Sequence, residues 1–121
     1  IMRNDESKCW SSLMSDFIQT QRIDLAAAFR WAVRLNYHEG VANHFSVAIN
    51  NSGSQFLINP NQRHFATIKA SDLLLLDANN QDTMSQANAP DPTAWGSMAR
   101  YTNIALMRAV YCTYIRYFRR C

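Results

Sequence analysis

The chain has 121 residues, 48% of them hydrophobic, and a formal net charge of +3. This length and composition predict one ordered domain with a modest core and exclude an intrinsically disordered chain. No stretch approaches the run of about 18 apolar residues that a membrane span needs, and we expect no secretory signal. The three cysteines match no metal-ligand spacing and leave one unpaired, so we expect reduced thiols and a cytoplasmic location.

Charge is distributed unevenly along the sequence. Residues 1–96 carry 7 Lys and Arg against 9 Asp and Glu, whereas residues 97–121 carry 5 Arg and no acidic residue. The composition therefore changes near Gly96. We predict a helical extension over residues 1–21, a domain over residues 22–96 and a basic aromatic tail over residues 97–121.

Two helices are expected in the first third of the chain. The segment Glu6–Gln21 has apolar residues in rough helical register, and a second helix is expected to begin at Arg22 and to pack against the first. Asp24 is the expected N-cap of the second helix, and Gly40 is expected to end it. The expected apolar face of this second helix comprises Leu25, Ala28, Phe29, Ala32 and Leu35.

A β-hairpin is predicted next. His44–Ile49 alternates between polar and apolar residues, Asn50–Gly53 has the composition of a turn, and Gln55–Ile58 is the returning strand. The apolar run Leu73–Leu76 indicates a buried strand, with a short helix as the alternative. Residues 79–92 are expected to form a loop.

Polar side chains gather where the second helix gives way to the hairpin. Asn43, His44 and Ser46 follow the helix within a few residues. Ligand groups often lie at such junctions because a rigid scaffold fixes the loop. Helix-capping residues occur there too, and the pattern alone favours capping.

Three stretches carry a family resemblance. RIDLAAAFRWAVRLNYHEGVANHFSVAI, FLINPNQRHFATIKASDLLLLD and APDPTAWG follow one another over about residues 20–96. In this order they resemble the N-terminal part of the class II aldolase/adducin family, and the step from Asn43 to Ser46 is closest to its adducin-type branch. The resemblance implies a three-layer α/β/α domain, truncated here, with a central, largely antiparallel sheet, and a homo-oligomer that is usually a tetramer.

The resemblance also implies site residues. Asn43, His44 and Ser46 match the family's substrate- or phosphate-facing loop, and Asn59 and Asn61 match a second loop near the substrate. The residue after this second loop is usually glycine in the family, and Gln62 stands there. Ala94 occupies the place of the glutamate that aldolase members use as their acid/base group, which argues against standard aldol chemistry.

Family aldolases cleave or epimerise small sugar phosphates with a divalent metal, usually zinc, held by three histidines. Two of these come from a His-x-His pair beyond the position of Gly96. Residues 97–121 contain no histidine, so the chain as written is predicted to bind no metal and to be inactive. A metal site built from His38, His44 and His64 is disfavoured by their irregular spacing, and His38 and His64 are expected at the surface or in packing roles.

A shifted reading frame would account for the absence of the His-x-His pair from residues 97–121. When each codon starts at the last base of the preceding one, SMARYTNIALMRAVYCTYIRYFRRC is consistent with LHGAIHQHCPHARCVLHVHSVFPTV. That string resembles the family's continuation, including the His-x-His pair. We therefore predict that one nucleotide is missing near the Gly96 codon. The alternative is a genuine basic helix, with Ile104, Met107, Val110, Tyr111, Tyr114 and Phe118 on one side, that binds a membrane or nucleic acid.

Two classes of function follow. The first is a fragment of a metal-dependent aldolase or epimerase, whose intact parent would act on a sugar-phosphate-like substrate and bind neither nucleic acid nor membrane. The alternative is a non-catalytic, adducin-like interaction or assembly domain, which the Asn43–His44 step and Ala94 favour.

Overall fold

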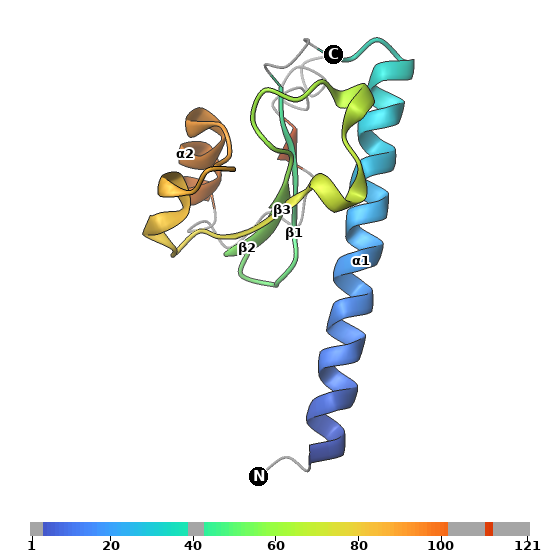
Figure 1. The fold of residues 1–121 in the computed structure, drawn as a ribbon, viewed down its shortest axis with the longest axis vertical. Helices are drawn as coiled ribbons and strands as arrows, with labels where there is room; N and C mark the ends of the chain where they lie inside the picture. The colour runs from blue at the N-terminus through green and yellow to red at the C-terminus, as the bar shows by residue number, and fades with distance from the viewer. Residues whose placement is uncertain (1–3, 39–42, 102–110, 113–121) are drawn as a thin grey trace.

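The computed structural model describes residues 4–38, 43–101 and 111–112 (Figure 1). Gly40 and most of the expected tail helix over residues 104–118 lie outside the described residues. The helices are α1 (Asn4–Arg34) and α2 (Pro92–Tyr101), and the strands are β1 (Phe45–Ala48), β2 (Gln55–Ile58), β3 (Leu74–Asp77) and β4 (Tyr111–Cys112). Three 3-10 helices, η1 (Phe65–Thr67), η2 (Ala70–Asp72) and η3 (Gln81–Ser85), lie in the connections.

The first third of the chain is one helix of 31 residues, and the expectation of two helices packed against each other is wrong. Asp24 lies inside α1 and is not an N-cap. The physical reason is that the segment around Arg22 contains neither glycine nor proline, so nothing interrupts the helical hydrogen bonds. The N-terminal half of α1 consequently projects beyond the sheet (Figure 1).

Helix α1 ends at Arg34, and the turn that follows it at Leu35 and Asn36 comes before the expected stop at Gly40. Asn36 has a φ of 60°, in the left-handed region that asparagine tolerates. The Tyr37 N–H donates to the carbonyl of Ala32 (2.7 Å), and the Asn36 N–H donates to the carbonyl of Val33 (3.0 Å). These two bonds form a Schellman motif. Leu35 falls in this turn and is 54% exposed, so its expected place on the buried face is wrong.

The predicted hairpin is confirmed. Strands β1 and β2 are antiparallel with Ser46 opposite Ile58 and Ala48 opposite Phe56. Gly53 has a φ of 73°, and its N–H donates to the Asn50 carbonyl (3.1 Å). Neighbouring strands are antiparallel throughout the sheet, whose order is β3-β2-β1-β4.

Strand β3 corrects the expectation of a buried strand over Leu73–Leu76. It begins one residue later, at Leu74, and stands at an edge of the sheet. Leu76 is buried, whereas Leu75 on the same strand is 43% exposed. The expected loop over residues 79–92 is also partly wrong, because η3 and the first residue of α2 lie within it.

The sheet has a hydrophobic core on each face, as the alternation of β2 requires. Leu57 contacts the cluster that includes Leu25 and Phe29 of α1. Phe56 and Ile58 belong to a second cluster with Ala94 of α2. Figure 1 shows α1 and α2 on opposite sides of the strands.

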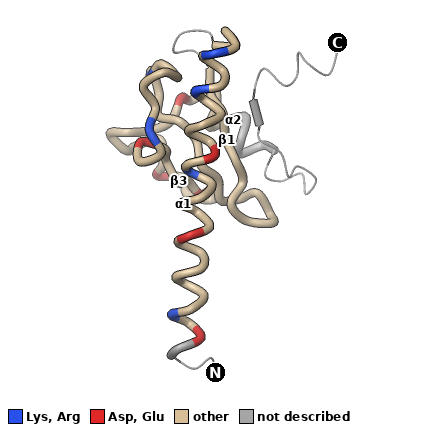
Figure 2. Tube along the Cα trace, turned by 90° about the vertical axis from the view of Figure 1, so that its right-hand side faces the viewer, with Lys and Arg blue, Asp and Glu red and all other residues tan. Residues whose placement is uncertain are grey.

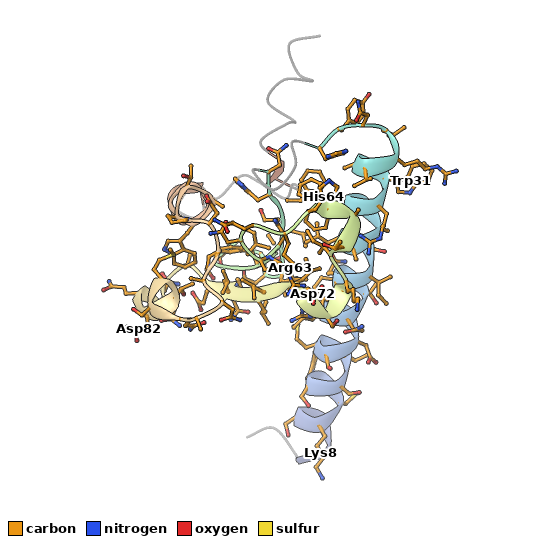
Figure 3. All side chains as sticks on the ribbon, turned by 45° about the horizontal axis from the view of Figure 1, so that its top comes forward. Lys8, Trp31, Arg63, His64, Asp72 and Asp82 are labelled. Atoms are coloured by element: carbon orange, nitrogen blue, oxygen red, sulfur yellow. The ribbon has the colours of Figure 1, made fainter. Side chains whose placement is uncertain are left out.

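Two arginines of α1 tie the helix to the segment between β2 and β3. Arg30 Nη1 donates to the Phe65 carbonyl (2.7 Å), and Arg22 Nη1 donates to the carbonyls of Ala70 (3.3 Å) and Leu73 (2.5 Å). Within the same segment Arg63 pairs with Asp72 (3.0 Å; Figure 3). Among the described residues, no helix combines the length and apolar character that crossing a bilayer requires.

Candidate functional site

A small polar cavity lies where β1 begins, β2 ends and α2 starts. Strands β1 and β2 are antiparallel neighbours, so the residues before β1 lie beside those after β2. The cavity volume is about 10 Å³, the space of about one water molecule. Its lining comprises Asn43, His44, Asn59, Pro60, Asn61, Gln62, Asp91 and Ala94.

An open groove continues from this cavity. It has a volume of about 520 Å³ and shares Pro60, Asn61 and Gln62 with the cavity. A volume of this size lies within the usual range for small-molecule pockets, about 300–1,000 Å³. In size, the cavity suits one water-sized polar group and the groove suits a small molecule.

Asn59 holds the two strand ends together. Its side-chain Oδ1 accepts a hydrogen bond from the Phe45 N–H (3.0 Å), and its Nδ2 donates to the carbonyls of Asn43 (3.3 Å) and Pro60 (3.4 Å). The residue is 5% exposed. Both amide hydrogens and one acceptor site of Asn59 are thus used inside the protein. Its structural role is to position the loop around Asn43.

Asn43 has a side-chain donor without a partner. The residue is buried, and its Nδ2 makes no hydrogen bond in the described part of the chain. A buried N–H without an acceptor costs free energy, so an acceptor oxygen placed in the cavity would be stabilised there. Ser46, in contrast, is fully buried in β1 and is not among the cavity's lining residues.

His44 and Asp91 contribute the cavity's titratable groups. Burial lowers the pKa of His44 below its usual 6.5, and the nearby Asp91 carboxylate partly offsets this shift. Asp91 caps α2, because its Oδ1 accepts from the N–H groups of Thr93 (2.9 Å) and Ala94 (3.0 Å). Sequence reasoning missed Asp91, although an Asp followed by Pro92 is a helix-start signal.

The lowered pKa of His44 predicts a pH-dependent stability. The folded state binds a proton at His44 less well than the unfolded state does. Protonation of His44 therefore lowers the free energy of unfolding, which is highest above the usual pKa of 6.5 and falls as pH drops below it. We expect the urea midpoint to fall between about pH 7.5 and 5.5, and to fall less in His44→Gln. An identical fall in both proteins would contradict this prediction.

The Asp72 carboxylate titrates in a separate window. The hydrogen bond donated by the Lys69 N–H, with a further contribution from Arg63, lowers the pKa of Asp72. Its stabilising effect is present above the usual value of 3.8 and is lost only as pH falls below it. The loss of stability between about pH 7.5 and 5.5 can therefore be assigned to His44, because Asp72 lowers stability only at more acidic pH.

The family profile described as the class II aldolase and adducin N-terminal domain matches residues 23–104. The chain belongs to the class II aldolase and adducin family. No curated protein and no solved structure gave a match. The family match begins within α1 and ends beyond Gly96.

Gln62 stands where the family resemblance implies a glycine. It has a φ of 56°, in the left-handed region. Glycine adopts this conformation without steric cost, whereas a side chain there costs about 1–2 kcal/mol. The backbone thus keeps the geometry of a glycine turn at a position occupied by glutamine.

Replacing this residue is expected to stabilise the fold. Gln62→Gly relieves the steric cost but adds entropy to the unfolded chain, so we expect a net gain of about 0.5–1 kcal/mol in urea denaturation. Asn61→Gly is the matched control, because Asn61 has no positive φ and should gain nothing. Equal effects of the two substitutions would refute the explanation.

Two of the three histidines pack against each other, and the third lies at the cavity. The rings of His38 and His64 pack edge to face with centroids 4.7 Å apart, in agreement with a packing role. His64 Nδ1 is engaged, since it accepts a hydrogen bond from the Ala66 N–H (3.1 Å), and His44 lies at the cavity with Asp91. The described ranges hold no group of three or more His, Cys, Asp or Glu placed to hold one ion.

Proposed function

We propose that the cavity binds an oxygen-rich, anionic small molecule of the sugar-phosphate type. The observation that carries the proposal is the unpartnered Asn43 Nδ2, buried in the cavity that Asn43 and His44 line and that shares residues with the larger groove. An amide donor and an imidazole suit phosphate or hydroxyl oxygens. Asn59 would act by positioning Asn43, while exposed Asn61 would contact the ligand directly. Ser46 would support the loop from inside β1.

We further propose that the chain as written is catalytically inactive. Ala94, at the position of the family's acid/base glutamate, is fully buried among apolar residues and has no group that transfers a proton. The His-x-His pair would be lost through the shifted frame. Consistent with this, the family match ends at residue 104, before positions 113–115, where the shifted frame spells that pair.

In the frame-restored parent, we propose a complete three-layer α/β/α domain of the adducin-type branch. This parent would be a cytoplasmic homo-oligomer that uses zinc as a Lewis acid. Membranes and nucleic acids would not be its partners.

A non-catalytic assembly domain is the second candidate. The burial of Ala94 favours it, because an alanine packed against Phe56 and Ile58 serves the core and no chemistry. Such a domain would keep the fold without needing the ligand site. Retro-aldol activity of the frame-restored protein on sugar phosphates separates the two candidates, since only an enzyme would show it.

Calorimetry on the chain as it exists tests the binding proposal. We expect dihydroxyacetone phosphate to bind, dihydroxyacetone to bind far more weakly, and Asn43→Asp to lose at least about tenfold in affinity for the phosphate compound. Asn51→Asp is the matched control: it makes the same change in the exposed β1–β2 turn, at the far end of the strands, and should bind as the wild type does. The proposal fails if the wild type does not bind, or if both variants bind equally.

The predicted absence of a bound metal has its own test. One equivalent of zinc that binds the wild type and is lost in His44→Gln would overturn that prediction.

A further inference from the structure

The N-terminal half of α1 carries an apolar stripe of large, exposed side chains in the described structure. Trp10 is 63% exposed, Leu13 56%, Met14 50% and Phe17 43%. This half of the helix extends away from the sheet (Figure 1), with only a few charges along it (Figure 2). A monomeric protein rarely exposes so many large apolar side chains together.

The residues of the stripe are arranged symmetrically about its midpoint, which lies between Leu13 and Met14. Glu6, Trp10, Leu13, Met14, Phe17 and Gln21 share one face of the helix. The spacings between them are 4, 3, 1, 3 and 4 residues. Their chemistry is also symmetric about the midpoint: a polar residue, an aromatic, two flexible aliphatic-type side chains, an aromatic and a polar residue.

We propose that this stripe is a dimer interface in which α1 pairs antiparallel with α1 of a second copy of the chain. A two-fold axis between Leu13 and Met14 would place Trp10 of each copy against Phe17 of the other. It would also bring Glu6 of each copy against Gln21 of the other, a carboxylate facing an amide donor. A self-complementary patch of this kind is what a two-fold interface requires.

The charge distribution of α1 and the area that the stripe could bury both agree with a second copy of the chain as the partner. The remaining charged residues in this part of the helix, Asp5, Lys8 and Asp16, lie off the stripe by helical position, so the antiparallel copy brings no like charges of the stripe face to face. The large apolar side chains of two copies would bury roughly 1,000 Å², which is at the lower limit for a specific interface. The dimer should therefore be reversible and concentration-dependent.

The interface lies outside the family domain. The family match begins at residue 23, whereas the stripe ends at Gln21. The proposal is thus independent of the cavity and its ligand, and it also accounts for the helix itself. A helical segment of this length that projects into solvent is marginal in water, and pairing would stabilise it.

Sedimentation velocity of the full chain over a wide concentration range tests the proposal. We expect a monomer–dimer equilibrium that Leu13→Glu weakens at least about tenfold. Ser12→Glu adds the same charge on the opposite face of the helix and should dimerise as the wild type does. Circular dichroism of both variants checks that the helix is retained.

Disulfide trapping tests the antiparallel direction in a background with Cys9, Cys112 and Cys121 replaced by serine. Leu13→Cys should cross-link to itself, because the two-fold axis passes beside it. Trp10→Cys alone should not, since the two thiols would be about 10 Å apart along the axis, but it should cross-link when mixed with Phe17→Cys. Trp10→Cys cross-linking to itself would indicate a parallel pair and overturn the proposal.

Other occupants of the stripe give other outcomes. A wild type that stays monomeric at every concentration, or a dimer that Leu13→Glu leaves intact, would overturn the proposal. A monomer that instead sediments with phosphatidylserine vesicles would assign the stripe to a lipid surface and overturn it as well.

Discussion

Phe29→Ala is expected to lower the free energy of unfolding by about 3–5 kcal/mol. Phe29 is fully buried in α1 and joins the helix to the sheet and to η1. Its ring stacks on Phe45 with centroids 4.8 Å apart and meets Phe65 edge to face at 4.6 Å. Removing the ring leaves a cavity at the centre of the cluster and breaks two aromatic contacts.

Trp31→Ala is the matched control for Phe29→Ala. It removes an aromatic ring from the same helix, but Trp31 is 58% exposed and points away from the sheet (Figure 3). Its contact with the Arg34 guanidinium, 5.6 Å from the ring centroid, is worth about 0.5–1 kcal/mol at an exposed site. Urea denaturation followed by circular dichroism should separate the two variants clearly. Equal losses would mean that the rings at the centre of the cluster do not hold α1 on the sheet.

Asn59→Ala is expected to cost about 2–4 kcal/mol of stability and to abolish ligand binding at the cavity. The substitution leaves the Phe45 N–H and the Asn43 carbonyl without the partners that Asn59 provides in the buried interior. The loop that presents Asn43 and His44 then loses its connection to the end of β2. Urea denaturation and calorimetry with dihydroxyacetone phosphate measure the two effects.

Two further substitutions show which atoms of Asn59 matter. Asn59→Asp keeps an acceptor for the Phe45 N–H but removes both donors, so we expect an intermediate loss of stability. Asn61→Ala, two residues away at an exposed position, should change stability by less than about 0.5 kcal/mol. If Asn61→Ala destabilised the protein as much as Asn59→Ala, the positioning role of Asn59 would be wrong.

Local sequence patterns predicted the elements that depend on near neighbours. The alternation around Phe45 and the turn at Gly53 predicted the hairpin, since strand period and positive φ are local properties. The helical spacing of Leu25, Phe29 and Ala32 predicted the buried face of α1. The extent of α1 was predicted poorly, because a cap residue such as Asp24 begins a helix only where the preceding residues are not already helical.

The site depended on contacts that no local pattern encodes. The family resemblance assigns Asn59 to ligand binding, but the hydrogen bonds of its side chain go to Phe45 and Asn43, fourteen or more positions earlier. Asp91 lies in the same cavity as His44 because α2 begins beside that cavity. Gln62 was identified from the sequence as a departure from glycine, and its positive φ explains in physical terms why glycine suits that position.

The nucleotide sequence from the Ala94 codon through the end of the reading frame tests the central claim most directly. If the chain is the N-terminal part of a class II aldolase/adducin-like protein interrupted by a lost base, one added nucleotide near the Gly96 codon will restore LHGAIHQHCPHARCVLHVHS. An open frame will then continue beyond it. Codons that cannot spell this string would contradict the account, and the basic tail would then be a genuine part of the protein.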